Sequence, residues 1–184
     1  MKKNNKGLSL VELVIVVAII VIFAGFSLYS AANIPGYRAR ECSRKITSNL
    51  NEMKITTLGK AKSNGDYVWV LHKKNGQFYI KSMVDCNSGS PILNKEIKIS
   101  KGRLTVTYKG ASGSDVELTD GKAIKLCFDR ASGALYACGT NEMSDANSDY
   151  TTTGSLTTIK EITVKGGSKT YTTKLVAATG KVMD

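Results

Sequence analysis

Glu12 is the residue of this chain whose position most strongly suggests chemistry. It lies at the head of an apolar run, and residues 13–37 carry no charged side chain. A lone carboxylate that enters hydrocarbon costs about 2.5–3.5 kcal/mol on insertion scales, so such a residue is a functional candidate. Lys2, Lys3 and Lys6 form a basic head in front of it. This arrangement predicts an apolar helix whose carboxylate has a role beyond anchoring.

The apolar run has the length of a membrane segment. At about 1.5 Å per helical residue it can cross a hydrocarbon core of about 30 Å. Lysines flanking such a segment remain in the cytoplasm, so the rest of the chain would face outward. We therefore expect a transmembrane helix over residues 8–37 with its N-terminus in the cytoplasm.

A resemblance to a known family is carried by residues 6–13, KGLSLVEL. This segment resembles the cleavage and methylation site of type IV prepilins, in which a membrane peptidase cuts after the glycine and methylates the new first residue. The resemblance implies a leader over residues 1–7, cleavage between Gly7 and Leu8, N-methylation of Leu8, and an assembly role for Glu12. Ordinary signal peptides are cut after the apolar run, not before it.

The resemblance also implies how the chain assembles. In the family, the glutamate meets the amine of the first residue, usually in a neighbouring subunit, and the exposed N-terminal amides of the helix attract the same carboxylate. Small residues allow close helix packing, and the apolar run contains Ala18, Ala24, Gly25, Ala31 and Ala32. The implied partners are the prepilin peptidase, other pilin subunits and the pilus assembly platform. The implied location is the cell membrane, followed by an extracellular pilus.

Four cysteines are present, Cys42, Cys86, Cys127 and Cys138. Their spacing, with His72 as the single histidine, argues against a zinc site. In an exported domain an even number of cysteines indicates disulfides. Three pairings are open. Cys127 and Cys138 flank an expected hairpin, which favours pairing them and leaving Cys42 with Cys86; free buried thiols are the alternative.

The sequence contains no recognisable catalytic centre. No Ser-His-Asp or Cys-His arrangement, phosphate-binding loop or dinucleotide fingerprint is found. His72 falls in an expected strand, where a packing or surface role is favoured over that of a base. Asp129 and Arg130 fall in an expected turn. We therefore expect a protein that is not an enzyme and uses neither a cofactor nor a metal.

The chain is basic, with a formal net charge of +11. Removing the three lysines of the leader leaves 23 basic against 15 acidic side chains, or about +8. A positive surface can attract an anionic partner such as DNA or a cell-wall polymer. The lysines are scattered, with no run longer than Lys73-Lys74, which favours a solvated surface instead.

A second helical segment is expected over residues 38–62. Pro35 and Gly36 should kink or interrupt the helix before it. Apolar or small residues then recur at spacings of three and four along one face, at Ala39, Cys42, Ile46, Leu50, Met53, Thr57 and Ala61. This amphipathic helix should lie on a sheet.

Residues 63–184 alternate strand patterns with turns. The expected strands are Tyr67–His72, Gln77–Ile80, Glu96–Ser100, Arg103–Lys109, Ala123–Asp129, Ala134–Cys138, Thr158–Lys165 and Lys169–Ala177, with a hairpin turn at Asn75-Gly76. The polar segment Asn141–Thr157 should be an exposed loop. We expect an α+β fold, with the long N-terminal helix packed on one antiparallel sheet, or two packed sheets, in a β-rich head domain.

Three segments of the head domain, residues 65–70, 123–133 and 174–182, resemble the GspH/FimT-type minor pilin domain. A minor pilin of a type IV pilus is therefore expected, with a major pilin as the competing interpretation. A pseudopilin of a type II secretion system has the same architecture. A DNA-binding uptake pilin is a weaker alternative, because Lys169, Lys174 and Lys181 are not accompanied by paired arginines. An anchored extracellular enzyme is the weakest.

Overall fold

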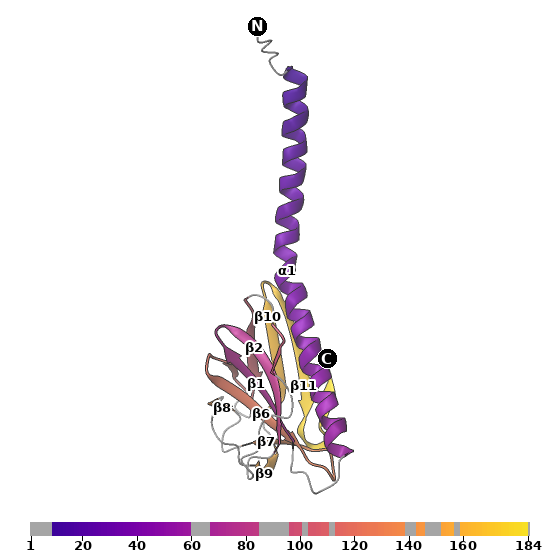
Figure 1. The fold of residues 1–184 in the computed structure, drawn as a ribbon, viewed down its shortest axis with the longest axis vertical. Helices are drawn as coiled ribbons and strands as arrows, with labels where there is room; N and C mark the ends of the chain where they lie inside the picture. Colours follow the sequence, from indigo (N-terminus) through magenta and orange to yellow (C-terminus); the bar gives the residue numbers. More distant parts are fainter. Residues whose placement is uncertain are drawn as a thin grey trace. The chain divides into compact units, whose positions relative to one another are not determined.

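The fold combines one long helix with two antiparallel sheets, which confirms the predicted α+β class (Figure 1). The computed structural model describes residues 9–59, 67–84, 96–100, 103–110, 113–138, 143–145, 152–156 and 159–183. The chain forms two compact units, Met1–Ile34 and Pro35–Asp184. The second unit, here called the head domain, contains the later part of the helix together with both sheets.

Helix α1 runs from Leu10 to Leu58 and contributes to both units. Pro35 lies inside it, so the helix is not interrupted there. Proline has a helical φ and removes only one backbone hydrogen bond, which a long helix can tolerate. Gly36 is buried, and a Cβ there would meet the side chain of Lys169, so this glycine permits close packing rather than looseness.

The membrane span predicted over residues 8–37 is not found. In the part of the chain that the structure describes, no helical segment combines the length and the hydropathy that a membrane span requires.

Within the head domain, α1 turns one face toward the sheets. Residues at the predicted spacing are buried there: Ala39, Cys42, Ile46, Leu50, Met53 and Thr57. Thr57 donates its hydroxyl to the carbonyl of Met53 at 2.8 Å, which satisfies a buried polar group. The amphipathic pattern is confirmed over these positions, and Ala61 lies outside the described residues.

Two sheets make up the rest of the head domain, and the strands paired in them run antiparallel. The first has the order β3 (Ile97–Lys98), β2 (Gln77–Val84), β1 (Tyr67–Lys74), β6 (Lys122–Phe128), β7 (Leu135–Cys138) and β9 (Thr152–Leu156), with β8 (Met143–Asp145) also paired to β6. The second has the order β12 (Lys181–Met183), β11 (Lys169–Val176), β10 (Glu161–Gly166), β4 (Thr105–Lys109) and β5 (Asp115–Glu117). A short 3-10 helix, η3 (Ala177–Thr179), joins β11 to β12.

The hairpin between β1 and β2 turns where the sequence predicts. Asn75 and Gly76 have φ values of 52° and 69°. Two consecutive positive φ angles define the type I′ turn, whose twist matches that of the flanking strands. This turn fixes the register, with Lys74 opposite Gln77 and Trp69 opposite Ser82.

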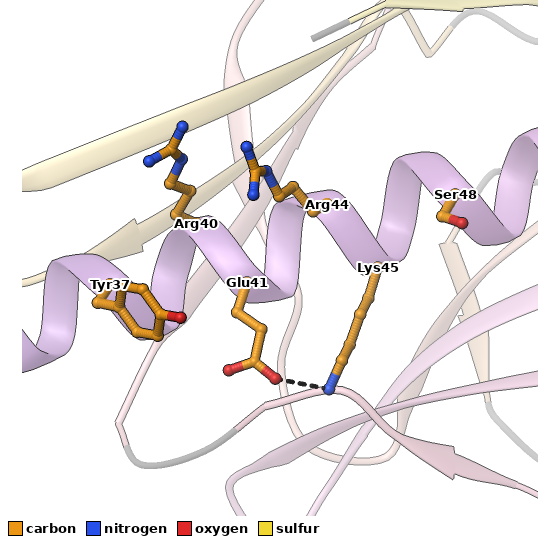
Figure 2. A pocket seen from close by; sticks show the side chains of 6 residues that line it. All are labelled: Tyr37, Arg40, Glu41, Arg44, Lys45 and Ser48. Atoms are coloured by element: carbon orange, nitrogen blue, oxygen red, sulfur yellow. Dashed lines mark ion pairs between the residues drawn. The ribbon is translucent and has the colours of Figure 1, made fainter.

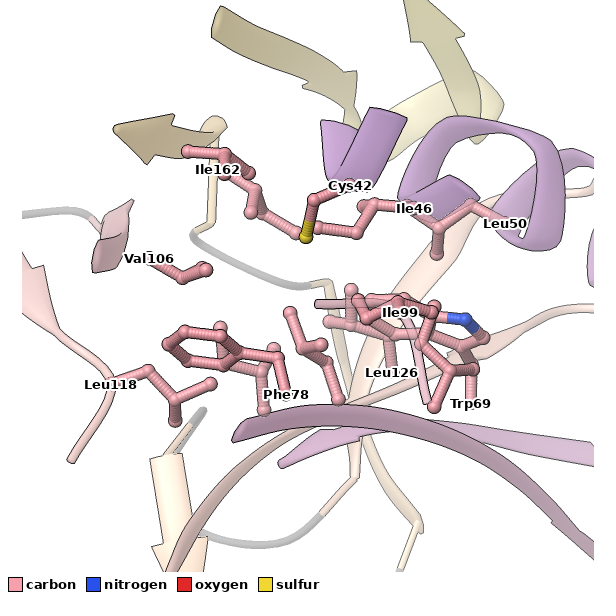
Figure 3. Close-up of a cluster of buried hydrophobic side chains, with 14 of the residues drawn as sticks. Cys42, Ile46, Leu50, Trp69, Phe78, Ile99, Val106, Leu118, Leu126 and Ile162 are labelled. Carbon is pink, nitrogen blue, oxygen red and sulfur yellow. The ribbon is translucent and has the colours of Figure 1, made fainter. Parts of the chain in front are cut away.

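One hydrophobic core lies between α1 and the inner faces of both sheets. Figure 3 shows Cys42, Ile46 and Leu50 of the helix facing Trp69 and Phe78 of the first sheet. Successive strand residues point to opposite faces, so the neighbours of Trp69 on β1 join a second, smaller cluster. That cluster contains Val68, Val70, Ala123 and Cys127. Strand β6 is therefore buried on both faces, from Ala123 to Phe128.

The segment Asn141–Thr157 is not simply a loop. Strands β8 and β9 form within it, and they pair with β6 and β7. The prediction of a loop is wrong at these positions because a sheet edge offers unpaired backbone groups, which short polar segments can satisfy without apolar side chains.

Candidate assembly site

Two hydrogen bonds that involve side chains cap the N-terminal end of α1. The Ser9 hydroxyl oxygen accepts a hydrogen bond from the Val11 amide at 3.3 Å, and Glu12 Oε2 accepts one from the Ser9 amide at 2.9 Å. This is a variant of the capping box in which the Ser9 hydroxyl accepts from the second rather than the third helical amide, and two amides that the helix leaves unpaired are satisfied by side chains. The Glu12 carboxylate is thus held at the positive end of the helix dipole.

The other predicted residues of this region, Gly7 and Leu8, lie outside the described residues. Cleavage between them and methylation of Leu8 therefore remain predictions. Ser9 directly follows Leu8, so the capping box holds the Glu12 carboxylate one residue along the chain from the predicted new amine.

The helix behind this cap displays apolar side chains on all sides. Every large apolar residue from Leu10 to Phe26 is exposed, and the least exposed of them, Ile19, still has 47% of its surface accessible. A helix that is apolar all round is stable in water only when another apolar surface covers it. The segment from Leu10 to Phe26 therefore requires an apolar surface outside itself to cover its side chains.

Neither predicted disulfide is formed. Cys42 and Cys127 are free thiols, and Cys86 lies outside the described residues. Cys42 is on the core face of α1, where burial raises the pKa of its thiol to about 12. In the sheet, Cys127 pairs with Tyr136 rather than with Cys138, and its sulfur contacts the Tyr136 carbonyl oxygen at 3.7 Å.

His72 packs inside the first sheet, in agreement with the role expected from the sequence. Its ring is 5.6 Å from that of Tyr79, in a stacked arrangement, and its Nε2 lies 2.6 Å from Oε1 of Glu96. Burial lowers the pKa of His72, and the nearby Glu96 carboxylate opposes this shift. The sequence did not reveal this pair, because only the pairing of β1, β2 and β3 brings Glu96 close to His72.

Asp129 has the predicted turn role. Its Oδ2 accepts hydrogen bonds from the amide and the hydroxyl of Ser132, and these bonds hold the pKa of the carboxyl group below its usual value. The turn they stabilise joins β6 to β7 and ends at Gly133, whose φ is 70°.

The C-terminal turn packs onto this same region. A Cβ at Gly180 would collide with the carbonyl oxygen of Gly133 and would lie about 3.0 Å from the Phe128 ring. Lys54 of α1 donates to the Thr179 carbonyl at 2.8 Å. The segments that resemble the minor pilin domain are therefore neighbours: β1 pairs with β6, and the turn before β12 covers the end of β6.

A hollow of about 300 Å³ lies on the outer face of α1. It is lined, among the described residues, by Tyr37, Arg40, Glu41, Arg44, Lys45 and Ser48. Figure 2 shows the guanidinium groups of Arg40 and Arg44 on one side of the helix, while Glu41 and Lys45 form a 2.9 Å ion pair on the other. The sequence placed Arg40 and Arg44 off the buried face but did not indicate that both line one hollow.

Comparison with known proteins gives one match, to the N-terminal region. Residues 2–28 match the family model of the prokaryotic N-terminal methylation motif. No curated protein matches the chain, and neither does any solved structure. The chain thus carries an N-terminal signal of the type found in type IV prepilins and pseudopilins, as the sequence indicates. In general terms, such a motif implies a prepilin peptidase and other pilin subunits as partners.

Proposed function

We propose that this protein is a structural subunit of a type IV pilus, assembled through its N-terminal helix, and that it is not an enzyme. The observation that carries this proposal is the first turn of α1. There, a single carboxylate lies within the methylation motif, at the head of an apolar helix whose side chains are exposed.

In this proposal the peptidase cuts between Gly7 and Leu8 and leaves a positively charged amine at Leu8. The carboxylate of Glu12 forms an ion pair with the N-terminal amine of a neighbouring subunit. Neither charge is then left unpaired when the helices pack together. Pairing is required because a buried unpaired charge costs several kcal/mol. The capping box supports this step, since it already holds Glu12 at the end of the helix where the amine arrives.

The apolar segment from Leu10 to Phe26 would form the filament core with copies of itself or with related pilins. The head domain would lie outside this core. Before assembly, the motif is consistent with a subunit retained at the membrane, from which the assembly platform inserts it into the growing filament.

Within the pilin class we propose a minor pilin of the GspH/FimT type. The support is the packing of the three resembling segments, in which Gly180 covers the end of β6 next to Gly133. A pseudopilin of a secretion system would share the same signal and the same chemistry of assembly.

The experiment that tests the proposal combines shearing with mass measurement. Filaments sheared from cells that express the chain should contain it, and its intact mass should correspond to a chain that starts at Leu8 and carries one methyl group. A wild-type chain that retains Met1–Gly7 in every fraction would overturn the proposal.

A further inference from the structure

The head domain carries exposed charges of opposite sign at two separate places. One is the arginine pair, Arg40 and Arg44, on the outer face of α1. The other is the acidic edge, Asp115 and Glu117, on strand β5. Both places are exposed, and both belong to the same compact unit.

The arginine pair lacks a counter-charge. Among the described residues, neither guanidinium forms an ion pair, because the one nearby carboxylate that lines the hollow, Glu41, is bound to Lys45. Residues four apart on a helix have Cβ atoms about 5–6 Å apart, and like charges at this spacing destabilise the helix. Two guanidinium groups on the same side of the helix can both donate hydrogen bonds to a carboxylate (Figure 2).

The acidic edge is accessible to another molecule. Strand β5 is the last strand of the second sheet, and Asp115 and Glu117 point to the same side of it, two residues apart. The Nζ atom of Lys73 lies 3.7 Å from Oε1 of Glu117, which makes a long ion pair. The Glu117 side chain nevertheless remains 53% exposed. In the described part of the chain, Asp115 has no ion pair.

The two places lie on separate elements of the head domain, one on α1 and the other on β5. Helix α1 contacts β11 through hydrogen bonds between the hydroxyl groups of Ser43 and Thr173 and between those of Thr47 and Thr173. Strand β5 is three strands away from β11 in the same sheet, or about 14 Å at the usual spacing of strands. A contact between two different surfaces of neighbouring copies is a head-to-tail interface, and such an interface builds an open helical filament when its rotation does not close into a ring.

We propose that Arg40 and Arg44 of one subunit bind the carboxylates of Asp115 and Glu117 on β5 of the next copy of this chain. This proposal rests on the proposed function, since it names the contact between head domains in a filament. It adds a polar contact to the apolar packing of the N-terminal helices. The electrostatic complementarity sets which faces of neighbouring head domains meet.

A charge exchange tests the contact in the full chain. Arg44→Glu and Asp115→Lys should each lower the sheared filament fraction by about tenfold, because each variant places like charges across the interface. The double variant, Arg44→Glu with Asp115→Lys, should restore incorporation. Arg38→Glu is the matched control, because it makes the same charge change at an exposed position of α1 outside the hollow.

Several outcomes overturn the proposal. Incorporation of Arg44→Glu equal to that of Arg38→Glu would do so, as would a double variant no better than the single ones. If the wild-type chain is found in sheared filaments in these experiments, the proposed function stands even when the contact between head domains is refuted. If the wild-type chain is absent from filaments, both proposals are refuted. If Arg44→Glu lowers only the retention of labelled double-stranded DNA on filaments, the arginine pair binds phosphodiesters and the contact between copies is refuted.

A cross-link gives a direct readout. With Arg44→Cys and Asp115→Cys in the same chain, mild oxidation of filaments should yield a ladder of disulfide-linked oligomers. Either single cysteine variant should give no ladder beyond that of the wild type. Filaments of the paired variant that remain monomeric on a non-reducing gel would contradict the proposed geometry.

Discussion

The carbonyl oxygen of Pro35 lies against the Cα of Gly166, at the tip of the hairpin between β10 and β11, with no room for a side chain between them. A Cβ at Gly166 would overlap that oxygen and would also come within 2.9 Å of Ala39 Cβ. The start of the head-domain part of α1 therefore packs directly against the backbone of the hairpin between β10 and β11.

We expect Gly166→Ala to destabilise the head domain by about 1–3 kcal/mol, because the added methyl group has to displace backbone rather than a flexible side chain. Thermal or denaturant unfolding of the full chain measures this loss. Gly25→Ala is the control, since a Cβ at Gly25 meets nothing within 4 Å. Equal stability of the two variants would show that the hairpin can move away from Pro35 at little cost.

The burial of His72 predicts a pH dependence of stability. An unfolded chain protonates its histidine as the pH falls below about 6.5, whereas the lowered pKa of His72 means that the folded form takes up this proton only at a lower pH. The unfolded state therefore binds more protons in this range, and the free energy of unfolding falls as the pH falls from 7.5 to 5.5, by at most about 1.4 kcal/mol per pH unit.

His72→Phe should flatten this dependence, because phenylalanine retains a ring next to Tyr79 but does not titrate. Unfolding curves of wild type and variant at pH 7.5, 6.5 and 5.5 make the comparison. The lowered pKa of Asp129 moves its titration further below this range, so Asp129 does not interfere. Parallel curves for the two proteins would assign the pH dependence to other groups.

Glu12 is expected to matter for assembly and not for the stability of the head domain. Glu12→Val removes both the cap on Ser9 and the charge, whereas Glu12→Gln keeps an oxygen that can accept from the Ser9 amide. Losing one partner of a buried charge pair costs about 3–5 kcal/mol, so both variants should be exported and cleaved, yet poorly incorporated. Blots of sheared and membrane fractions measure this. Normal incorporation of Glu12→Gln alone would mean that the cap, not the charge, is required.

Processing should depend on the absence of a side chain just before the predicted cut. Gly7→Val is expected to block cleavage, so that the intact mass of the membrane form corresponds to a chain beginning at Met1. Gly7→Ala adds a smaller side chain and should reduce cleavage less than Gly7→Val does. A Gly7→Val chain that is shortened like the wild type would place the cut elsewhere.

Cys42 should be inert in the folded protein. With its pKa raised to about 12, only about one thiol in ten thousand is ionised at pH 8, and the side chain has no exposed surface. Iodoacetamide should label Cys42 only after denaturation, as peptide mapping can show. A cysteine introduced by Ser48→Cys, on the exposed side of the same helix, should react at once. Rapid native labelling of Cys42 would indicate that α1 separates from the sheets.

Local patterns predicted a large part of this fold. The spacing of Ala39, Cys42 and Ile46 identified the buried helix face, and Asn75-Gly76 identified the hairpin, because both signals depend on residues close together in the sequence. Strands β8 and β9 were missed because their pairing is supplied by β6 and β7, not by their own polar side chains.

For the candidate site, the sequence indicated Glu12 as the candidate carboxylate but not its contact with Ser9, which requires the start of the helix to be known. The fit of Gly166 to Pro35 and the contact of His72 with Glu96 join residues 131 and 24 positions apart. Such relationships depend on the order of the strands, which no local pattern specifies. The favoured disulfide failed for the same reason, since the register placed Tyr136, not Cys138, opposite Cys127.

The contact of Ser43 with Thr173 joins residues 130 positions apart, and it constrains the order in which the molecule can fold. The stripe containing Cys42, Ile46 and Leu50 is among the first parts of the head domain to be synthesised, yet β11 is among the last. Until β11 has emerged, the second sheet cannot complete the core around this stripe. Contacts so distant in sequence also form slowly. A chaperone that shields residues 39–53 of the nascent chain would therefore raise the yield of folded protein without changing its final stability.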